Sequence, residues 1–429
     1  MNMTLFDFLD RSPTCYHAVK NLTDILTEAG YRNLQEFAPW AIAEGGKYFV
    51  TRGDSALMAF RVPKRDFRGF MLSASHSDSP SFKVRQTAES ALSGGCRKLN
   101  VEPYGGMIQR SWLDRPLSVA GRCMVRRDGR IETRLVDIDR DLLIIPSVAI
   151  HMDRDVNRNG ALNAAVDLQP LFTQGDTSLR QLIAEELTAQ EEDILETELF
   201  LYPRMKSAAL GAEGEFIASP RLDDLQCVYG CLQGFLAAEE SQSVPVFCVF
   251  NHEEVGSGTR QGADSTFLTD VLERISAAMG KTGEEYRAAI AQSFLVSADN
   301  AHAVHPAHPE FADKNEAPVL NGGVVLKYNA NQRYTTDALS AAVFAEVCRQ
   351  ADVPLQRYSN RPDLPGGSTL GCIAMAHLSI PAVDIGLPQL AMHACYEVAG
   401  AKDTHALIRA MTVYYSRSLC RGSDGSVAL

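Results

Sequence analysis

The stretch VPVFCVFNHEEVGSGTRQG, residues 244–262, indicates the fold class of this chain. Its apolar run from Val244 to Phe250 predicts a buried strand, and the glycine-rich turn from Val255 to Gly262 lets the backbone bend sharply afterwards. Two adjacent glutamates, Glu253 and Glu254, lie between them. Because open α/β sheets place their active sites at the carboxyl ends of strands, we expect an α/β fold with its chemistry at this point. Taken alone, however, an acidic pair in a turn is more often simply solvated.

Four other segments end apolar runs with residue types that bind metals. They are residues 70–80 with His76 and Asp78, 219–225 with Asp223 and Asp224, 294–305 with Asp299, His302 and His305, and 382–393 with His393. Each segment allows an ordinary structural role, such as dipole capping by the aspartates in a helix's first turn. A histidine near a strand end is likewise often only a hydrogen-bonding residue. Five such segments in one chain nevertheless indicate a shared metal site.

The charges of these candidate ligands suit two divalent cations. Asp223, Glu254 and Asp299 bring three negative charges, and the imidazoles of His76 and His393 are neutral ligands. Two divalent ions bring four positive charges, so the site keeps one net positive charge, which a hydroxide would balance. Paired ions of this kind lower the pKa of water and polarise a carbonyl, so the sequence predicts a dinuclear hydrolase. Mixed carboxylate and imidazole ligands fit zinc, and they also fit manganese or cobalt.

Six segments, in order and at similar spacing, resemble the aspartyl aminopeptidase group of the M18 family of metallo-aminopeptidases. They are HSDSP, SPRLDDL, FNHEEVGS, SADNAHAVHP, LKYNANQRY and LPQLAMH. The resemblance runs from Phe6 into the last predicted helix. It implies an enzyme that releases residues, Asp or Glu in preference, from the N-termini of peptides. One departure is Asp224, where Asn is more usual; it is expected to be protonated, hydrogen bonded at the helix start, or turned away from the metals.

The resemblance also implies roles for the candidate residues. Two metal ions would share Asp223, with ligands His76, Asp223 and Asp299 for one ion and Asp223, Glu254 and His393 for the other. Glu253 would be the general base, because its neighbour in sequence is a ligand and a base must lie within reach of the water it deprotonates. Asp78 would orient the site beside His76.

Four further residues are implied near the substrate. Lys327 and Tyr334 match positions beside the substrate's side chain, where a lysine ammonium would favour an acidic residue. The alternative for Lys327 is a strand residue with its charged head in water. His302 matches a position from which an imidazole donates to the developing oxyanion, although a purely structural hydrogen bond is equally open to it. His151 matches a histidine that reaches the active site of a neighbouring subunit.

Composition excludes several other classes of protein. The chain has 429 residues, of which 45% are hydrophobic, and a formal net charge of -12. A nucleic-acid binder would need clustered Lys and Arg, and the sequence shows no such basic cluster. No apolar run is long enough for a membrane span, and the start, MNMTLFDFLD, lacks the pattern of a signal peptide. Ten cysteines without a Cys-x-x-Cys pair fit free thiols in a reducing compartment, so we expect a cytoplasmic protein.

The positions of the ligands predict the domain organisation. His76 comes early and the other ligands follow residue 220, so residues 1–90 and 214–429 are predicted to form a mixed-sheet α/β/α catalytic domain. Residues 91–213 are predicted to form an inserted, mainly β domain. Within it we expect strands at Leu117–Val125 and Arg130–Val136 and a helical segment near Ser178–Glu192. The resemblance implies that this insert dimerises subunits and that the dimers assemble into a tetrahedral dodecamer.

Three other functions stay open on the sequence. An aminopeptidase that prefers apolar N-terminal residues would use the same site, as would a related metal-dependent amidohydrolase that removes an acyl group. A non-catalytic scaffold is the third alternative. The presence of Glu253 beside a complete set of ligands speaks against a scaffold, because nothing structural requires that base.

Overall fold

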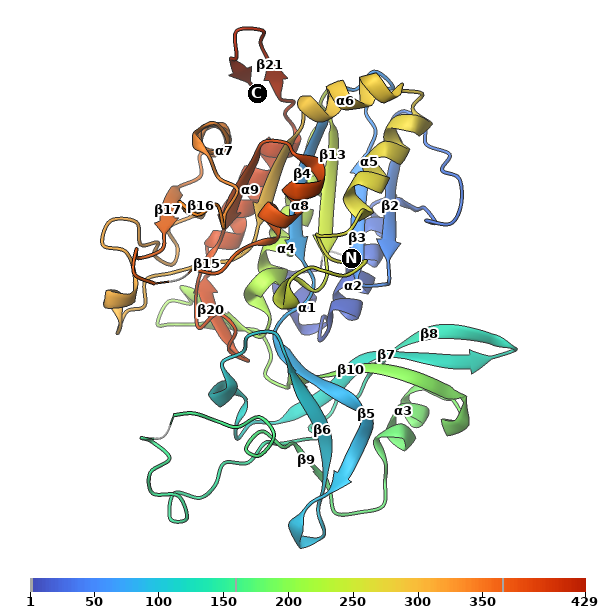
Figure 1. Cartoon of the computed structure of the whole chain (residues 1–429), viewed down its shortest axis with the longest axis vertical. Coiled ribbons are helices and arrows are strands. Elements are labelled where there is room, and N and C mark those ends of the chain that lie inside the picture. The colour runs from blue at the N-terminus through green and yellow to red at the C-terminus, as the bar shows by residue number, and fades with distance from the viewer. Residues whose placement is uncertain (1–2, 159, 365) are drawn as a thin grey trace.

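The structure, a computed structural model, describes residues 3–158, 160–364 and 366–429. Figure 1 shows a lobe in which helices cover a central sheet, and beside it a second lobe built mainly of strands. The second lobe comes from one continuous part of the chain, which runs from β5 to β10.

A nine-stranded sheet forms the centre of the first lobe. Its order is β1-β2-β3-β13-β4-β14-β18-β16-β17. The four central strands, β13, β4, β14 and β18, are parallel, so their carboxyl ends meet at one edge of the sheet. The bounds in sheet order are Arg32–Asn33, Lys47–Arg52, Ala56–Arg61, Val244–Phe250, Phe70–His76, Phe294–Ala298, Ala382–Gly386, Val324–Tyr328 and Leu355–Ser359.

Helices cover both faces of this sheet. One face packs against α1 (Leu5–Asp10), α2 (Cys15–Glu28), α4 (Leu222–Ala237), α7 (Ala338–Ala351) and α9 (Asp403–Tyr415). The other packs against α5 (Phe267–Ala278), α6 (Gly283–Ala291) and α8 (Leu370–Leu378). Along β13, Phe247 and Val249 join the first core, whereas Val246 and Cys248 join the second. Burial on both faces explains why the whole strand is apolar, and the predicted α/β/α arrangement is confirmed.

A six-stranded antiparallel sheet forms the second lobe, in the order β8-β7-β10-β5-β6-β9. The strands predicted near residues 117–125 and 130–136 are β7 and β8, while the predicted helical segment is the shorter α3, Leu179–Leu187. The sheet begins before residue 91, because β5 already pairs with β6 and β10. Its bounds in chain order are β5 Ser81–Ala91, β6 Arg97–Tyr104, β7 Leu117–Arg127, β8 Arg130–Asp137, β9 Leu171–Thr173 and β10 Ile194–Pro203. The mainly β character of this part is confirmed, and the domain boundaries stay a prediction.

A third sheet of short strands connects distant parts of the chain. Its order is β11-β12-β20-β19-β15, and it joins the segment before α4 to the segment before α9. The bounds are β11 Ala208–Leu210, β12 Phe216–Ser219, β20 Glu397–Gly400, β19 Pro388–Leu390 and β15 Ala301–His302. The connection between β19 and β20 carries His393. Among the described residues, no helix combines the length and apolar composition that a membrane span requires.

Candidate active site

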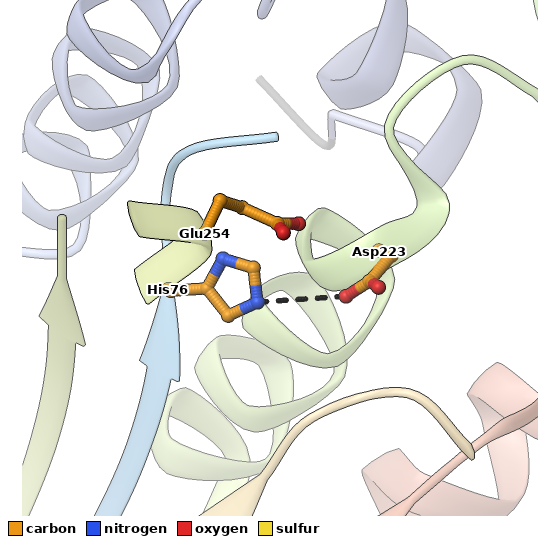
Figure 2. Close-up of side chains that lie close together, drawn as sticks. All are labelled: His76, Asp223 and Glu254. Carbon is orange, nitrogen blue, oxygen red and sulfur yellow. Dashed lines mark ion pairs between the residues drawn. The ribbon is translucent and has the colours of Figure 1, made fainter. Parts of the chain in front are cut away.

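The five predicted metal ligands come from five segments that converge near the carboxyl edge of the central sheet. His76 is the last residue of β4, Asp299 follows β14, and Glu254 lies in the short helix η4 (Glu253–Val255) after β13. Asp223 lies in the first turn of α4, and His393 follows β19. Figure 2 shows the side chains of His76, Glu254 and Asp223 pointing toward one another.

The carboxylate of Asp223 lies between the two histidines. Its Oδ1 is 3.4 Å from Nε2 of His76, and its Oδ2 is 3.4 Å from Nε2 of His393. The same nitrogen of His393 is 3.4 Å from Oε2 of Glu254. Two ligand atoms about 2.1 Å from one tetrahedral ion are themselves ~3.4 Å apart. These three separations therefore suit atoms that share metal ions.

Among the residues that the structure describes, two overlapping groups of side chains offer ligand atoms within 4.8 Å of one another. One group is His76, Asp223 and Glu254, and the other is Asp223, Asp224 and Asp299. Asp223 belongs to both groups, as the predicted bridging residue would. The first group, however, joins His76 with Glu254, whereas the family resemblance joins His76 with Asp299. The assignment of each ligand to one ion or the other stays a prediction.

Several carboxylate oxygens at this place are buried without a hydrogen-bond donor. They are Oδ1 of Asp223, Oδ1 of Asp224 and Oε1 of Glu254. Burial raises the pKa of Glu254 and of Asp224 well above their usual values. Buried carboxylates without donors are costly unless a proton or a cation accompanies them. Since carboxylates and imidazoles together are typical zinc ligands, the residues present fit divalent metal ions.

Each histidine has a second partner that leaves Nε2 free to face Asp223. In the tautomer that donates from Nδ1, His76 donates to the backbone oxygen of Asp78 at 3.1 Å, and His393 donates to the backbone oxygen of Gly106 at 2.7 Å. Burial opposes protonation of both rings, but contact with Asp223 and the charges of the neighbouring carboxylates outweigh it. The pKa of His393 rises to about 10, and that of His76 rises well above its usual value. The acidic cluster thus attracts positive charge, which metal ions can supply.

Asp78 fixes the backbone that carries the predicted base. Its carboxylate accepts from the backbone N–H groups of Glu253 and Glu254, both at 3.2 Å, and from the Tyr104 hydroxyl at 2.6 Å. Its Oδ1 also lies 3.5 Å from Nδ1 of His76. Burial alone would raise the pKa of Asp78, but His76 and Tyr104 lower it below its usual value. Asp78 is therefore a charged acceptor that orients both His76 and the Glu253–Glu254 turn.

Glu253 is partly buried beside these carboxylates. Burial raises the pKa of Glu253 to about 8; the carboxylates of Asp299, Asp78 and Asp223 act in the same direction and His76 in the opposite one. A carboxylate with a pKa near neutrality can take up and release a proton, which a general base requires.

Three of the four residues predicted near the substrate are connected to Asp299 by a series of side-chain contacts. Nζ of Lys327 is 3.7 Å from Oδ1 of Asp299 and 5.5 Å from the ring centroid of Tyr334. The ring centroid of Tyr358 lies 6.4 Å from that of Tyr334 and 5.8 Å from that of His302. Lys327 is only 3% exposed, so its ammonium does not reach bulk water. Burial alone would lower the pKa of Lys327, but Asp299 raises it above its usual value.

The fourth residue, His151, is exposed in the long connection between β8 and β9. Within the part of the chain that the structure describes, it belongs to neither group of candidate metal ligands. A role for His151 in the active site of another subunit stays a prediction.

The described residues near the site include three that were not predicted, Tyr104, Tyr358 and Glu397. Tyr104 and Tyr358 come from strands, and Glu397, at the start of β20, accepts hydrogen bonds from the backbone of Asp223 and of His393. The local sequence carries no signal for Glu397, because an acidic residue at the start of a short strand can equally be solvated. The unusual Asp224 is fully buried, and its Oδ2 accepts from the backbone N–H of His76 at 3.1 Å. It is thus hydrogen bonded, although to β4 rather than at the helix start.

Comparison with known proteins gives consistent matches over nearly the whole chain. The family model described as aminopeptidase I zinc metalloprotease (M18) matches residues 8–415. A probable M18 family aminopeptidase 2 of Clostridium novyi is 41% identical over 423 residues, which cover 96% of this chain and 98% of the relative. The protein of the same name in Clostridium acetobutylicum is 42% identical over 422 residues, with the same coverage of 96% and 98%.

Solved structures agree with these relatives. Ape4, in a cryo-EM structure of the Ape4 and Nbr1 complex, superposes with a TM-score of 0.93 and 37% identity, covering 96% of this chain and 84% of that chain. The S. cerevesiae mApe1 dodecamer superposes with a TM-score of 0.85 and 26% identity, covering 96% and 95%. The chain therefore belongs to the M18 family of zinc metallo-aminopeptidases and is a peptide hydrolase.

Proposed function

We propose that the chain is a dinuclear metal-dependent aminopeptidase that releases N-terminal residues, with a preference for Asp or Glu. The observation that carries the dinuclear proposal is the position of Asp223, whose two oxygens each lie 3.4 Å from a different histidine. Oδ1 of Asp223 and Oε1 of Glu254 are buried and accept no hydrogen bond, which supports it further.

The proposed ligands of the two ions are His76, Asp223 and Asp299 on one side, and Asp223, Glu254 and His393 on the other. When bound, such ions supply Lewis acidity at the scissile carbonyl and lower the pKa of water. Zinc is the proposed metal because the family is described as zinc metalloproteases, while the donor set also suits manganese or cobalt.

The chain's own residues would move the protons. Glu253 would take a proton from the attacking water and pass it to the departing amine, since a single base can serve both steps. Asp78 would keep Glu253 in place through the backbone N–H groups of the turn. His302 would donate to the oxyanion that develops on the substrate carbonyl.

The acidic preference rests on Lys327 and Tyr334. A buried ammonium in water-poor surroundings attracts a substrate carboxylate more strongly than an exposed one would. Lys327 already contacts Asp299, so it also offsets negative charge among the proposed ligands. A preference for apolar residues would follow if that contact occupies Lys327 completely.

We further propose that the insert, residues 91–213, dimerises subunits and that dimers assemble into a dodecamer in the cytoplasm. The connection between β8 and β9 exposes large apolar side chains, among them Val148 at 57%, Met152 at 83% and Val166 at 68%. Large apolar side chains that are exposed to this degree favour burial against another protein surface. The similarity to a dodecameric relative points the same way, and His151 on this connection would then reach a neighbouring active site.

Hydrolysis of matched peptides that begin with Asp, Glu, Leu or Lys tests this function. We expect cleavage that favours Asp and Glu, stops with a chelator and returns with zinc, manganese or cobalt. A preference for Leu would contradict the acidic specificity alone. Cleavage that persists in chelator, or that requires an N-acetylated substrate, would contradict the aminopeptidase mechanism and favour another hydrolase.

A further inference from the structure

We propose that Glu397 is a positioning residue that sets the affinity of the metal centre. This inference rests on the proposed function, because it takes Asp223 and His393 as metal ligands. Glu397 is the first residue of β20 and is 2% exposed. Its Oε2 accepts from the backbone N–H of Asp223 at 3.1 Å, and its Oε1 accepts from the backbone N–H of His393 at 2.7 Å. One carboxylate thus joins the backbones of two proposed ligands that are far apart in sequence.

Both backbones need such an acceptor. His393 has a φ of 67°, in the left-handed region that a residue with a side chain rarely adopts without support. Asp223 has φ -81° and ψ 109°, which is not helical although it lies in the first turn of α4. Amides in a helix's first turn lack partners within the helix. Glu397 supplies the missing partner in each case.

A third donor completes the surroundings of this carboxylate. Nε2 of Gln389 donates to Oε1 of Glu397 at 3.3 Å. Oε1 of Gln389 in turn accepts from the side-chain Nδ2 of Asn300, which follows the proposed ligand Asp299 in sequence. All three hydrogen bonds to Glu397 come from N–H donors, so its two oxygens act as acceptors. A glutamine in its place would turn an NH2 group toward one of these donors.

The expected consequence concerns metal binding. Glu397 acts through the ligands, and residues that orient metal ligands typically change metal affinity by about 10- to 100-fold when substituted. Glu397→Gln keeps the size of the side chain and replaces one accepting oxygen with an NH2 group. Asp223 and His393 would then lose their common anchor while every proposed ligand stays in the chain.

Asp403 offers a matched control in the same molecule. It is also fully buried, and its two oxygens accept from the backbone N–H groups of Gly323 at 2.9 Å and Asn321 at 2.8 Å. Asp403→Asn therefore makes the same chemical change at a backbone that carries no proposed ligand. A general effect of losing a buried carboxylate that accepts two backbone hydrogen bonds would therefore appear in both variants.

The test compares wild type, Glu397→Gln and Asp403→Asn as full chains. Zinc affinity is measured by competition with a chromophoric chelator, and the visible spectrum is recorded after cobalt replaces zinc. We expect Glu397→Gln to bind zinc about 10- to 100-fold more weakly than wild type and to have an altered cobalt spectrum. Asp403→Asn is expected to match wild type in both readouts, even where its thermal stability falls.

Unchanged zinc affinity and cobalt spectrum in Glu397→Gln would overturn the inference, and so would an equal loss in Asp403→Asn. If Glu397→Gln does not fold, Glu397→Asp carries the same test, because its shorter side chain keeps the carboxyl group but cannot span both backbones. Tight zinc binding by wild type and by the Glu397 variant alike would overturn this inference alone. A wild type that binds no zinc would overturn the proposed function and this inference with it.

Discussion

The carboxylate of Asp223 lies between two imidazole rings, 3.4 Å from each through a different oxygen. Its position depends on neighbours that are not ligands themselves. The backbone N–H of Asp223 bonds Glu397, and Ser79 donates to its backbone oxygen at 2.9 Å. Single residues around the site can therefore be divided into those proposed to bind metal, those proposed to move protons and those that orient the others.

The proposed base can be separated from the ligands by substitution. Glu253→Gln removes a base and no ligand, so we expect the hydrolysis rate to fall by about 10²- to 10⁴-fold while both metals stay bound. The measurements are kcat on an acidic peptide and the metal content of the purified protein. Glu254→Gln is the matched control at the next position, and it is expected to lose metal as well as activity. Normal kcat in Glu253→Gln would mean that another group acts as the base.

His17 provides a test of stability against pH away from the site. Burial, with the Arg221 charge as a second cause, lowers the pKa of His17 to about 4 from the usual 6.5. Because the folded pKa is below the unfolded one, the stabilisation is present above pH 6.5 and is lost as the pH falls through about 4. A shift of this size corresponds to about 3 kcal/mol of unfolding free energy.

His17→Gln does not titrate, so its unfolding free energy is expected to fall less than that of wild type between pH 6.5 and pH 4. Chemical denaturation at a series of pH values measures this difference. His308→Gln, at an exposed histidine, is the control. Parallel pH dependences for wild type and His17→Gln would show that His17 takes up no proton on unfolding.

The candidate ligands could be predicted from the sequence because each follows a recognisable strand or opens a helix. Glu397 and Tyr104 could not, since their importance arises from contacts with residues distant in the chain, Asp223 in one case and Asp78 in the other. Nothing in the local sequence distinguishes an acid that accepts two backbone N–H groups from one that is solvated.

Among the elements, β6 and the residues that follow it connect the second lobe to the site. Tyr104 at the end of β6 bonds Asp78, and the next residues supply the backbone oxygen of Gly106 to His393. The backbone N–H of Ile108 also donates to the backbone oxygen of His393 at 2.9 Å. The six-stranded sheet thus takes part in orienting residues of the site.

Tyr104→Phe tests that connection. It removes a hydrogen bond to a charged carboxylate, which is worth about 1.5 to 3 kcal/mol, so we expect kcat to fall by about 10- to 100-fold. Tyr202→Phe is the matched control, because the Tyr202 hydroxyl bonds Asp137 at the same 2.6 Å but away from the site. Equal kcat values for the two variants would contradict a role for Tyr104 in the reaction.

Elements with strong patterns were predicted more accurately than their ends. The bounds of β13 match the apolar run from Val244 to Phe250 because both of its faces are buried. The helical segment predicted up to Glu192 is shorter, since α3 ends at Leu187 and Thr188 turns into the left-handed region with a φ of 51°. No glycine marks that end in the sequence, so its position could not be predicted.

For the whole molecule, the third sheet was the part least accessible to sequence analysis. Its strands have two to four residues, too few for a periodic pattern, and they pair across long separations, as β12 does with β20. This sheet contributes Glu397 and the connection that carries His393. The geometry of the candidate site therefore depends on pairings that emerge only when the chain is folded.

Assembly is tested by His151→Ala. Because His151 is exposed and lies outside the groups of candidate ligands, we expect the variant to keep its metals and its oligomeric state while kcat falls. Light scattering, metal analysis and peptide hydrolysis measure the three properties, and Arg154→Gln in the same connection is the control. Normal kcat in an assembled variant would contradict a contribution of His151 to a neighbouring active site.

The most direct test of the dinuclear proposal is a crystal structure of the zinc-loaded protein with anomalous diffraction recorded at the zinc edge. The proposed site predicts two anomalous peaks in each chain, both within bonding distance of Asp223, one beside His76 and the other beside His393. A single peak, or peaks that Asp223 does not share, would contradict the dinuclear centre.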